Sequence, residues 1–121
     1  MKVEDFMRLK QEFDEHESVL LGVKKTEYAS DEDHLSNFKE VASWLGIYPE
    51  EYCMTLTLKH MHSILRAVKS QDYRWSWSSD IGEGLKQRIS DARNYLLLLA
   101  ALIEERECDD TMTKEDNGYC D

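Results

Sequence analysis

The chain has 121 residues, enough for one small domain with one hydrophobic core. It carries 25 Asp and Glu against 15 Lys and Arg, which gives a formal net charge of -10. This charge argues against nucleic acid or an anionic membrane as the main partner, because both bind basic surfaces. One Pro and five Gly leave few helix breakers, so the sequence favours long helices.

The first helix is expected over residues 3–24, where apolar residues recur at helical spacing and acidic residues form an outer face. Residues 25–34 lack such a stripe and are expected to form a loop that ends in N-capping Ser and Asp side chains. A short amphipathic helix follows over residues 35–45. It should end at Gly46, because glycine is common just after a helix.

A third helix is expected to begin at Pro49, because proline is tolerated in the first turn. One apolar stripe along it is predicted to face the core: Met54, Leu58, Met61, Leu65 and Val68. A neighbouring stripe carries three candidate cations, Lys59, His62 and Arg66, at spacings of three and four. Such a stripe could hold a phosphate, and a basic solvent-exposed face has the same pattern.

Aromatic residues are dense in the segment after the third helix. Tyr73, Trp75 and Trp77 lie within residues 70–80, where the helical spacing stops. Exposed aromatic rings stack on nucleobases, so Trp75 and Trp77 are candidates for contacting a base. The alternative is that these rings form a lid packed over one end of a helical bundle.

The last predicted helix runs from Glu83 to Glu104 and has two different halves. In the first half, Glu83, Asp91 and Asn94 share one polar face. In the second half, residues 95–103 are apolar on every side, and we expect this part to mediate homo-oligomerisation. Residues 106–121 are acidic and without apolar periodicity, so a mobile tail is predicted beyond a single helical domain over residues 1–105.

No predicted segment is suited to crossing a membrane, because the apolar run Tyr95–Ile103 is too short. The N-terminus is charged and lacks an apolar signal core. Three cysteines, without CxxC spacing, favour a reducing compartment and no disulfide framework. A cytoplasmic location is therefore expected.

Several short pieces, in this order, resemble a known group of proteins: Lys25-Thr26-Glu27-Tyr28, Asp33 to Asn37-Phe38, Gly46-Ile47, Lys59, His62, Glu83-Gly84 and Asp91-Ala92-Arg93-Asn94-Tyr95. Over residues 16–104 the chain resembles small phage-type nucleotide-modification-associated proteins. Their all-α fold is similar to that of the MazG-like nucleoside triphosphate pyrophosphohydrolases. The expected architecture is therefore an all-α, MazG-like bundle of about four helices with no β-sheet, located in the host cytoplasm if phage-encoded.

The resemblance implies a Mg²⁺ site, since carboxylates on neighbouring helices of MazG-like enzymes bind magnesium that engages the substrate's phosphates. Asp91 would then be a ligand, Glu83 would belong to the same cluster, and Asn94 stands where a second acid often lies. This chain departs from the pattern because Lys59 and His62 stand where the facing helix would offer acids. Hydrolysis is left open.

Three functions remain at this stage. The first is a nucleotide-binding protein on a MazG-like scaffold, with Mg²⁺-dependent triphosphate cleavage as its enzymatic form. The second is a non-catalytic sponge that sequesters a nucleotide signal of host defence. The third is an acidic interaction protein or DNA mimic that binds a host protein. The expected nucleotide site comprises Lys59, His62, Arg66, Asn94, Trp75 and Trp77, with Asp91 and Glu83 as metal ligands.

Overall fold

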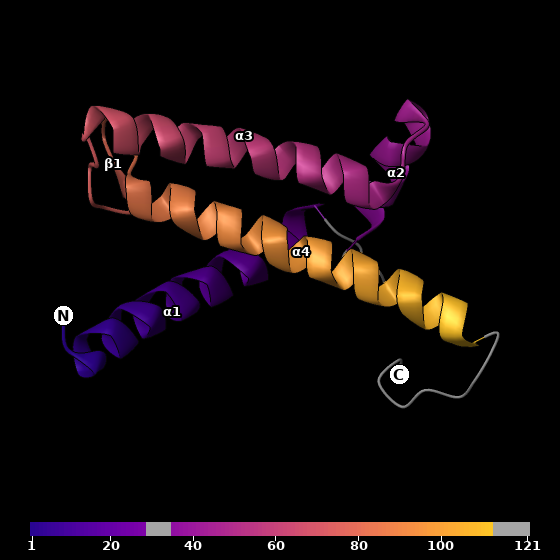
Figure 1. Ribbon diagram of the computed structural model, residues 1–121, viewed down its shortest axis with the longest axis horizontal. Helices are drawn as coiled ribbons and strands as arrows, with labels where there is room; N and C mark the ends of the chain where they lie inside the picture. Colours follow the sequence, from indigo (N-terminus) through magenta and orange to yellow (C-terminus); the bar gives the residue numbers. More distant parts are fainter. Residues whose placement is uncertain (29–34, 113–121) are drawn as a thin grey trace. The chain divides into compact units, whose positions relative to one another are not determined.

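The computed structural model describes residues 1–28 and 35–112, and it describes side chains for residues 1–18 and 35–109. Within these residues the chain forms four helices and one short antiparallel ladder (Figure 1). The prediction of a mostly helical protein is confirmed. The chain divides into two compact units, Met1–Asn37 and Phe38–Asp121, and a MazG-like arrangement of the helices stays a prediction.

The first unit contains α1 (Val3–Tyr28). Glu4 and Asp5 lie in its first turn, where negative charge complements the helix dipole. Because α1 continues to Tyr28, residues 25–28 are helical and the expectation of a loop there is wrong. The rest of that expected loop, with its capping residues, lies at 29–34, outside the described residues.

Helices α2 (Ser36–Leu45) and α3 (Pro49–Ser70) begin and end close to the predicted residues. Gly46 adopts a φ of 70°, and the amide of Ile47 donates a hydrogen bond to the Ala42 carbonyl oxygen at 3.1 Å. This left-handed residue ends α2 as expected. At the start of α3, the Tyr48 amide donates to Glu51 Oε1 at 3.3 Å, so this glutamate caps the helix.

A two-stranded antiparallel ladder connects α3 to α4. Strand β1 (Ser78–Ser79) pairs with β2 (Gly82–Glu83) around the two-residue turn Asp80-Ile81. The prediction of no β-sheet is therefore wrong in this detail. Strands of two residues are too short to produce the alternation by which a strand is recognised in a sequence.

Helix α4 (Leu85–Met112) starts after Glu83 and continues past Glu104. The expected end of the last helix at Glu104 is therefore wrong, and residues 106–112 of the predicted tail are helical. The remaining part of the predicted tail, residues 113–121, lies outside the described residues. Arg106 explains part of the extension, because its guanidinium hydrogen-bonds the Glu50 carboxylate on α3.

Helices α3 and α4 lie side by side and antiparallel in the second unit (Figure 1). Small side chains are buried along this pair: Cys53, Thr57 and Ala67 on α3, and Ser90 and Ala92 on α4. Small residues let two helices approach closely, so few large side chains fit between them. The core of this helix pair is therefore narrow.

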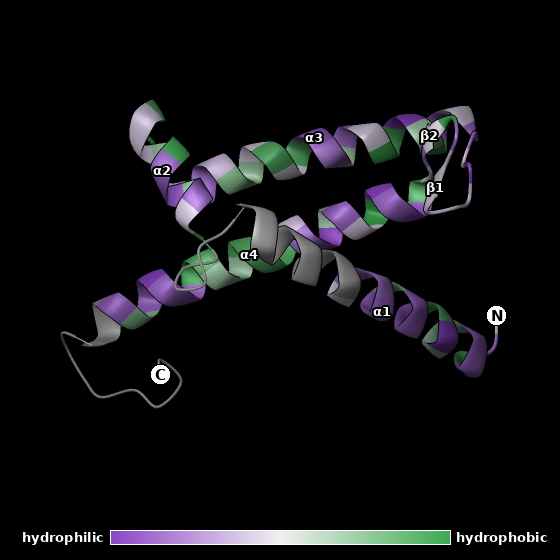
Figure 2. Ribbon diagram, turned by 180° about the vertical axis from the view of Figure 1, so that it is seen from behind, coloured by the Kyte–Doolittle hydropathy of each residue, from purple (hydrophilic) through white to green (hydrophobic). Residues whose placement is uncertain are grey.

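The buried face of α3 differs from the face that the sequence predicted to be buried. The buried residues Cys53, Thr57 and Ala67 stand one position before members of the predicted core stripe, which is instead exposed at 38–59% from Met54 to Val68. On α4, Leu96, Leu97 and Ile103 are also exposed, so the segment 95–103, which is apolar on every side, is not covered on every side within the chain. Figure 2 shows hydrophobic residues interspersed along α3 and concentrated in the middle of α4.

The cysteines differ from one another. Cys53 is a free, fully buried thiol that donates to the Tyr95 carbonyl oxygen at 3.3 Å, and burial raises its pKa. Cys108 is disulfide-bonded, which departs from the expectation of no disulfide. Over the described residues, no helix is both long and apolar enough to cross a membrane.

Candidate functional site

A polar pocket of about 450 Å³ lies in the second unit where the chain passes from α3 to α4. Its walls come from the last turns of α3, the loop after Ser70, strand β2 and the first turn of α4. The lining residues are His62, Ser63, Arg66, Ala67, Ser70, Asp72, Tyr73, Arg74, Glu83, Leu85 and Arg88. Residues on both sides of the connection therefore contribute charge to one cavity.

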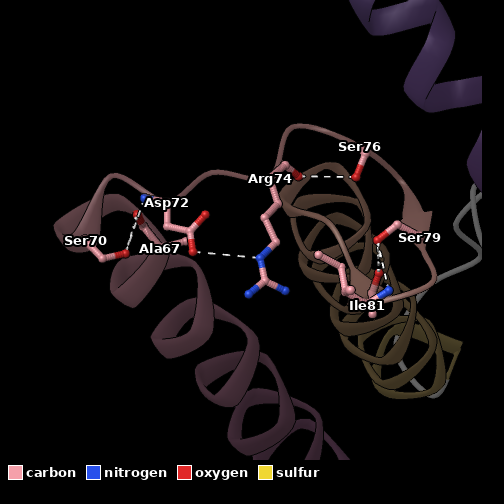
Figure 3. Close-up of polar contacts among 8 residues, drawn as sticks. Ala67, Ser70, Asp72, Arg74, Ser76, Ser79 and Ile81 are labelled. Carbon is pink, nitrogen blue, oxygen red and sulfur yellow. Dashed lines mark hydrogen bonds and ion pairs between the residues drawn. The ribbon is translucent and has the colours of Figure 1, made fainter.

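The loop that forms one wall is fixed to the backbone of α4. The Arg74 carbonyl oxygen accepts hydrogen bonds from the amides of Ser76 at 2.7 Å and Leu85 at 3.0 Å. The Leu85 amide is one of the first amides of α4, which lack a partner inside the helix. Figure 3 shows the loop in front of α4, with the Arg74 side chain directed toward Asp72. These two hydrogen bonds fix the backbone of Arg74 against the start of α4.

Two residues of this loop adopt left-handed backbone conformations. Gln71, which ends α3, has a φ of 57°, and Arg74 has a φ of 41°. Non-glycine residues adopt this region infrequently, and such strain is concentrated at functional sites. The hydrogen bonds of the Arg74 carbonyl oxygen stabilise this backbone conformation, which turns the loop back over α4.

Gly84 is required by the same packing. A Cβ atom built at this position would overlap the Ser76 carbonyl oxygen and lie 2.6 Å from the Arg74 carbonyl oxygen. The Gly84 amide also donates to the Trp77 carbonyl oxygen at 3.0 Å. Only glycine leaves room for the loop to approach the start of α4 this closely.

The pocket is basic although the protein is acidic. Arg66, Arg74 and Arg88 outnumber the two lining acids, Asp72 and Glu83, which gives the lining a formal charge of +1 with His62 neutral. The whole chain carries -10. The ion pair between Arg74 Nε and Asp72 Oδ2 is long, at 3.8 Å, and both side chains are about half exposed, so it holds Arg74 only weakly.

The helix ends add opposing contributions to this charge. Leu85 and Arg88 belong to the first turn of α4, and the amides of a helix N-terminus favour an anion. Ser70 ends α3, whose carbonyl groups carry partial negative charge. Because the two dipole ends offset each other, the arginine side chains decide the preference of the pocket for anions.

Three residues expected from the sequence line this pocket: His62, Arg66 and Glu83. Lys59 and Asn94 do not line it, and Lys59 is exposed on α3. The structure thus brings together only part of the expected nucleotide site. The sequence had placed Lys59 and His62 opposite Asp91 and Asn94, but α3 packs against α4 through the stripe that contains Cys53, Thr57 and Ala67.

Trp75 and Trp77 do not line the pocket. Instead, Lys86 Nζ lies 5.3 Å from the centroid of the Trp75 ring and 5.9 Å from that of Trp77. Both distances are within the range of a cation–π interaction. The rings therefore pack at the start of α4, an arrangement that fits the predicted lid.

Asp91 lies farther along α4. Its Oδ1 accepts a hydrogen bond from Gln87 Nε2 at 2.9 Å. The pKa of Tyr95 is raised mainly by burial, and the nearby Asp91 charge raises it further. Within residues 1–28 and 35–112, no group of three or more His, Cys, Asp and Glu side chains could hold a metal ion. Asp91 therefore belongs to no such group among the described residues, and a Mg²⁺ site at Asp91 and Glu83 stays a prediction.

Sequence spacing did not reveal Arg88 as a pocket residue. On α4 it does not belong to the polar face of Glu83, Asp91 and Asn94 from which the site was predicted. The available signal was topological, because a short connection between antiparallel helices brings the end of one beside the start of the next. Arg66, Arg74 and Arg88 lie around such a connection.

A second contact between these helices involves His60 and Tyr95. Their ring centroids are 4.7 Å apart, and Phe38 lies against Tyr95 with a centroid distance of 6.2 Å. Burial is the main cause of the raised pKa of Tyr95. These rings form an aromatic cluster, so His60 rather than the predicted His62 contacts the middle of α4.

Comparison of the chain with protein-family models, curated proteins and solved structures finds no match. The resemblance to phage-type MazG-like proteins therefore stays a hypothesis.

Proposed function

We propose that this protein binds a nucleotide or nucleotide-derived small molecule through its phosphate groups, in the pocket between the end of α3 and the start of α4. The observation that carries the proposal is the convergence of Arg66, Arg74 and Arg88 on one cavity in a strongly acidic chain. Guanidinium groups match phosphate oxygens with paired, charge-assisted hydrogen bonds.

The pocket also offers groups for the organic part of the ligand. Tyr73 lines it with 44% of its surface exposed, and His62 lies on the α3 side. Aromatic rings stack on nucleobases regardless of their sequence. A volume of about 450 Å³ lies within the range of small-molecule sites. These features favour a nucleotide over inorganic phosphate alone.

The proposal is binding without a metal-dependent step. Among the described residues that line the pocket, Asp72 and Glu83 are the two carboxylates, and Asp72 is paired with Arg74. Such a lining fits direct contact with phosphate better than magnesium-assisted hydrolysis. This chemistry supports the non-catalytic form of the proposal, such as sequestering a nucleotide signal. A MazG-like ancestry and a cytoplasmic location would agree with it.

Isothermal titration calorimetry with linear and cyclic nucleotides, with and without Mg²⁺, tests the proposal. Arg66→Ala should weaken binding by about 1.5–3 kcal/mol, the usual contribution of a charged hydrogen bond. Lys59→Ala is the matched control, because Lys59 is an exposed cation of the same helix that does not line the pocket. Affinity that falls with Lys59→Ala but not with Arg66→Ala would place the ligand elsewhere.

Failure of the wild type to bind any nucleotide would contradict the proposal. The acidic interaction protein would then be the better interpretation, with the net charge of -10 as its basis. Binding only in the presence of Mg²⁺, together with release of pyrophosphate, would instead support the enzymatic form of the hypothesis.

A further inference from the structure

The exposed apolar stripe of α3 extends along most of the helix. Its members are Met54, Leu58, Met61, Leu65 and Val68, which recur at alternating steps of four and three. Met54 and Val68 are 14 positions apart, so the stripe is about 21 Å long. This spacing averages 3.5 residues, the repeat by which two helices pack along a common seam. An exposed seam of this kind marks an interface.

The charges of α3 are separated along its length. Its first half, Pro49–Leu58, contains Glu50 and Glu51 and no Lys or Arg, whereas residues 59–70 contain Lys59, Arg66 and Lys69 and no acid. Two copies of this helix packed in parallel would place like charges together. Packed antiparallel, the acidic half of each would lie beside the basic half of the other.

We propose that α3 pairs antiparallel with α3 of a second copy of this chain, forming a two-fold symmetric dimer along the stripe. A two-fold axis perpendicular to the helix produces this arrangement, because each surface then meets its own copy. The stripe is centred at Met61, and the span from Glu51 to Lys69 is centred one residue earlier, at His60. One register therefore aligns the apolar seam and brings each Glu51 near Lys69 of the other copy.

This surface differs from the half-helix 95–103 that the sequence suggested for oligomerisation. That segment also has exposed leucines, with Leu97 64% exposed. It contains no Lys, Arg, Asp or Glu, so it offers no charge pattern that specifies an orientation. The α3 stripe combines apolar exposure with complementary charge, and the inference does not depend on nucleotide binding.

Sedimentation velocity over a range of micromolar concentrations tests the interface. The wild type should be a dimer, and Leu58→Glu should raise its dissociation constant by about a hundredfold, because an unpaired carboxylate would be buried in an apolar seam. Leu97→Glu on α4 is the matched control and should leave the dimer intact. Circular dichroism checks that both variants stay helical.

A charge exchange tests the orientation. Lys69→Glu and Glu51→Lys should each weaken the dimer, and the double variant should regain affinity, because the pair is restored with its signs reversed. Lys69→Glu does not affect the hydrogen bond from the Tyr48 amide to the Glu51 side chain. This variant therefore remains informative if Glu51→Lys disturbs the start of α3. No recovery in a folded double variant would overturn the antiparallel arrangement.

Two other outcomes would overturn the proposal. A wild type that remains monomeric would mean that no second copy covers the stripe; apolar residues of α1, such as Phe6, would then be the candidate cover within the same chain. A dimer that dissociates with Leu97→Glu but not with Leu58→Glu would assign the interface to α4.

Discussion

The Arg106 guanidinium binds both oxygens of the Glu50 carboxylate, with Nε 2.9 Å from Oε1 and Nη2 3.0 Å from Oε2. The two residues are 56 positions apart and connect the start of α3 to the second half of α4. Arg106 Cζ also lies 4.9 Å from the centroid of the Tyr48 ring. This bidentate pair fixes α4 beyond Glu104, at the end of the helix pair opposite the pocket.

The pair predicts a pH-dependent contribution to stability. The hydrogen bonds of Arg106 hold the pKa of Glu50 below the ordinary value of a glutamate, so the native state favours the charged carboxylate. The stabilisation is present above the unfolded pKa and is lost as the pH falls through the lower folded pKa. Glu50→Gln should reduce the free energy of unfolding at pH 7 by up to about 1 kcal/mol.

Urea denaturation at pH 7 and at pH 3 measures this effect. Glu51→Gln is the control in the same turn, because its remaining side-chain oxygen can still accept from the Tyr48 amide. The difference between Glu50→Gln and wild type should be smaller at pH 3 than at pH 7, because protonation of the Glu50 carboxylate as the pH falls weakens its ion pair with Arg106. An equal difference at both pH values would contradict the role of the ion pair.

Gly84→Ala should disrupt the wall of the pocket. Its Cβ would overlap the Ser76 carbonyl oxygen, so the loop that carries Arg74 must move, at a cost of about 1–3 kcal/mol. Thermal unfolding should show the loss of stability, and calorimetry should show weaker nucleotide binding. Gly46→Ala is the control, because a Cβ at Gly46 has open space and that turn lies outside the pocket. Gly46→Ala should lower the free energy of unfolding, because residue 46 has a φ of 70°, and it should not change the affinity for nucleotide.

Trp75→Ala separates the two interpretations of the aromatic segment. If Trp75 belongs to a lid around Lys86, the change should lower stability by about 0.5–1 kcal/mol from the lost cation–π contact, plus the lost packing. Nucleotide affinity should remain unchanged, whereas Tyr73→Ala should reduce it. A loss of affinity with Trp75→Ala in a folded protein would restore the prediction that this ring contacts a base.

The helices were predictable where local chemistry determines them. Pro49 and Gly46 mark a helix start and a helix end because their backbone preferences act without tertiary contacts. The buried face of α3 was not predictable, because two adjacent stripes compete for the core. Cys53 and Ala67 lie in the stripe that faces α4, since small side chains allow the helices to approach.

The candidate site was only partly predictable for the same reason. His62 and Arg66 were found because they share one helical face, which depends on sequence spacing alone. Arg74 and Arg88 reach the same cavity through the turn between the helices. That turn depends on hydrogen bonds of the Arg74 carbonyl group and on the close approach at Gly84, which helical periodicity does not record.

Nuclear magnetic resonance with a nucleoside triphosphate tests the central claim most directly. Two-dimensional ¹H–¹⁵N spectra of the wild type, recorded during a titration without Mg²⁺, should show chemical-shift changes concentrated at residues 62–74 and 83–88. Arg66→Ala should require a higher nucleotide concentration for the same changes. No changes at saturating nucleotide, or changes centred on Asp91 and Asn94 with none around Arg74, would contradict binding in this pocket.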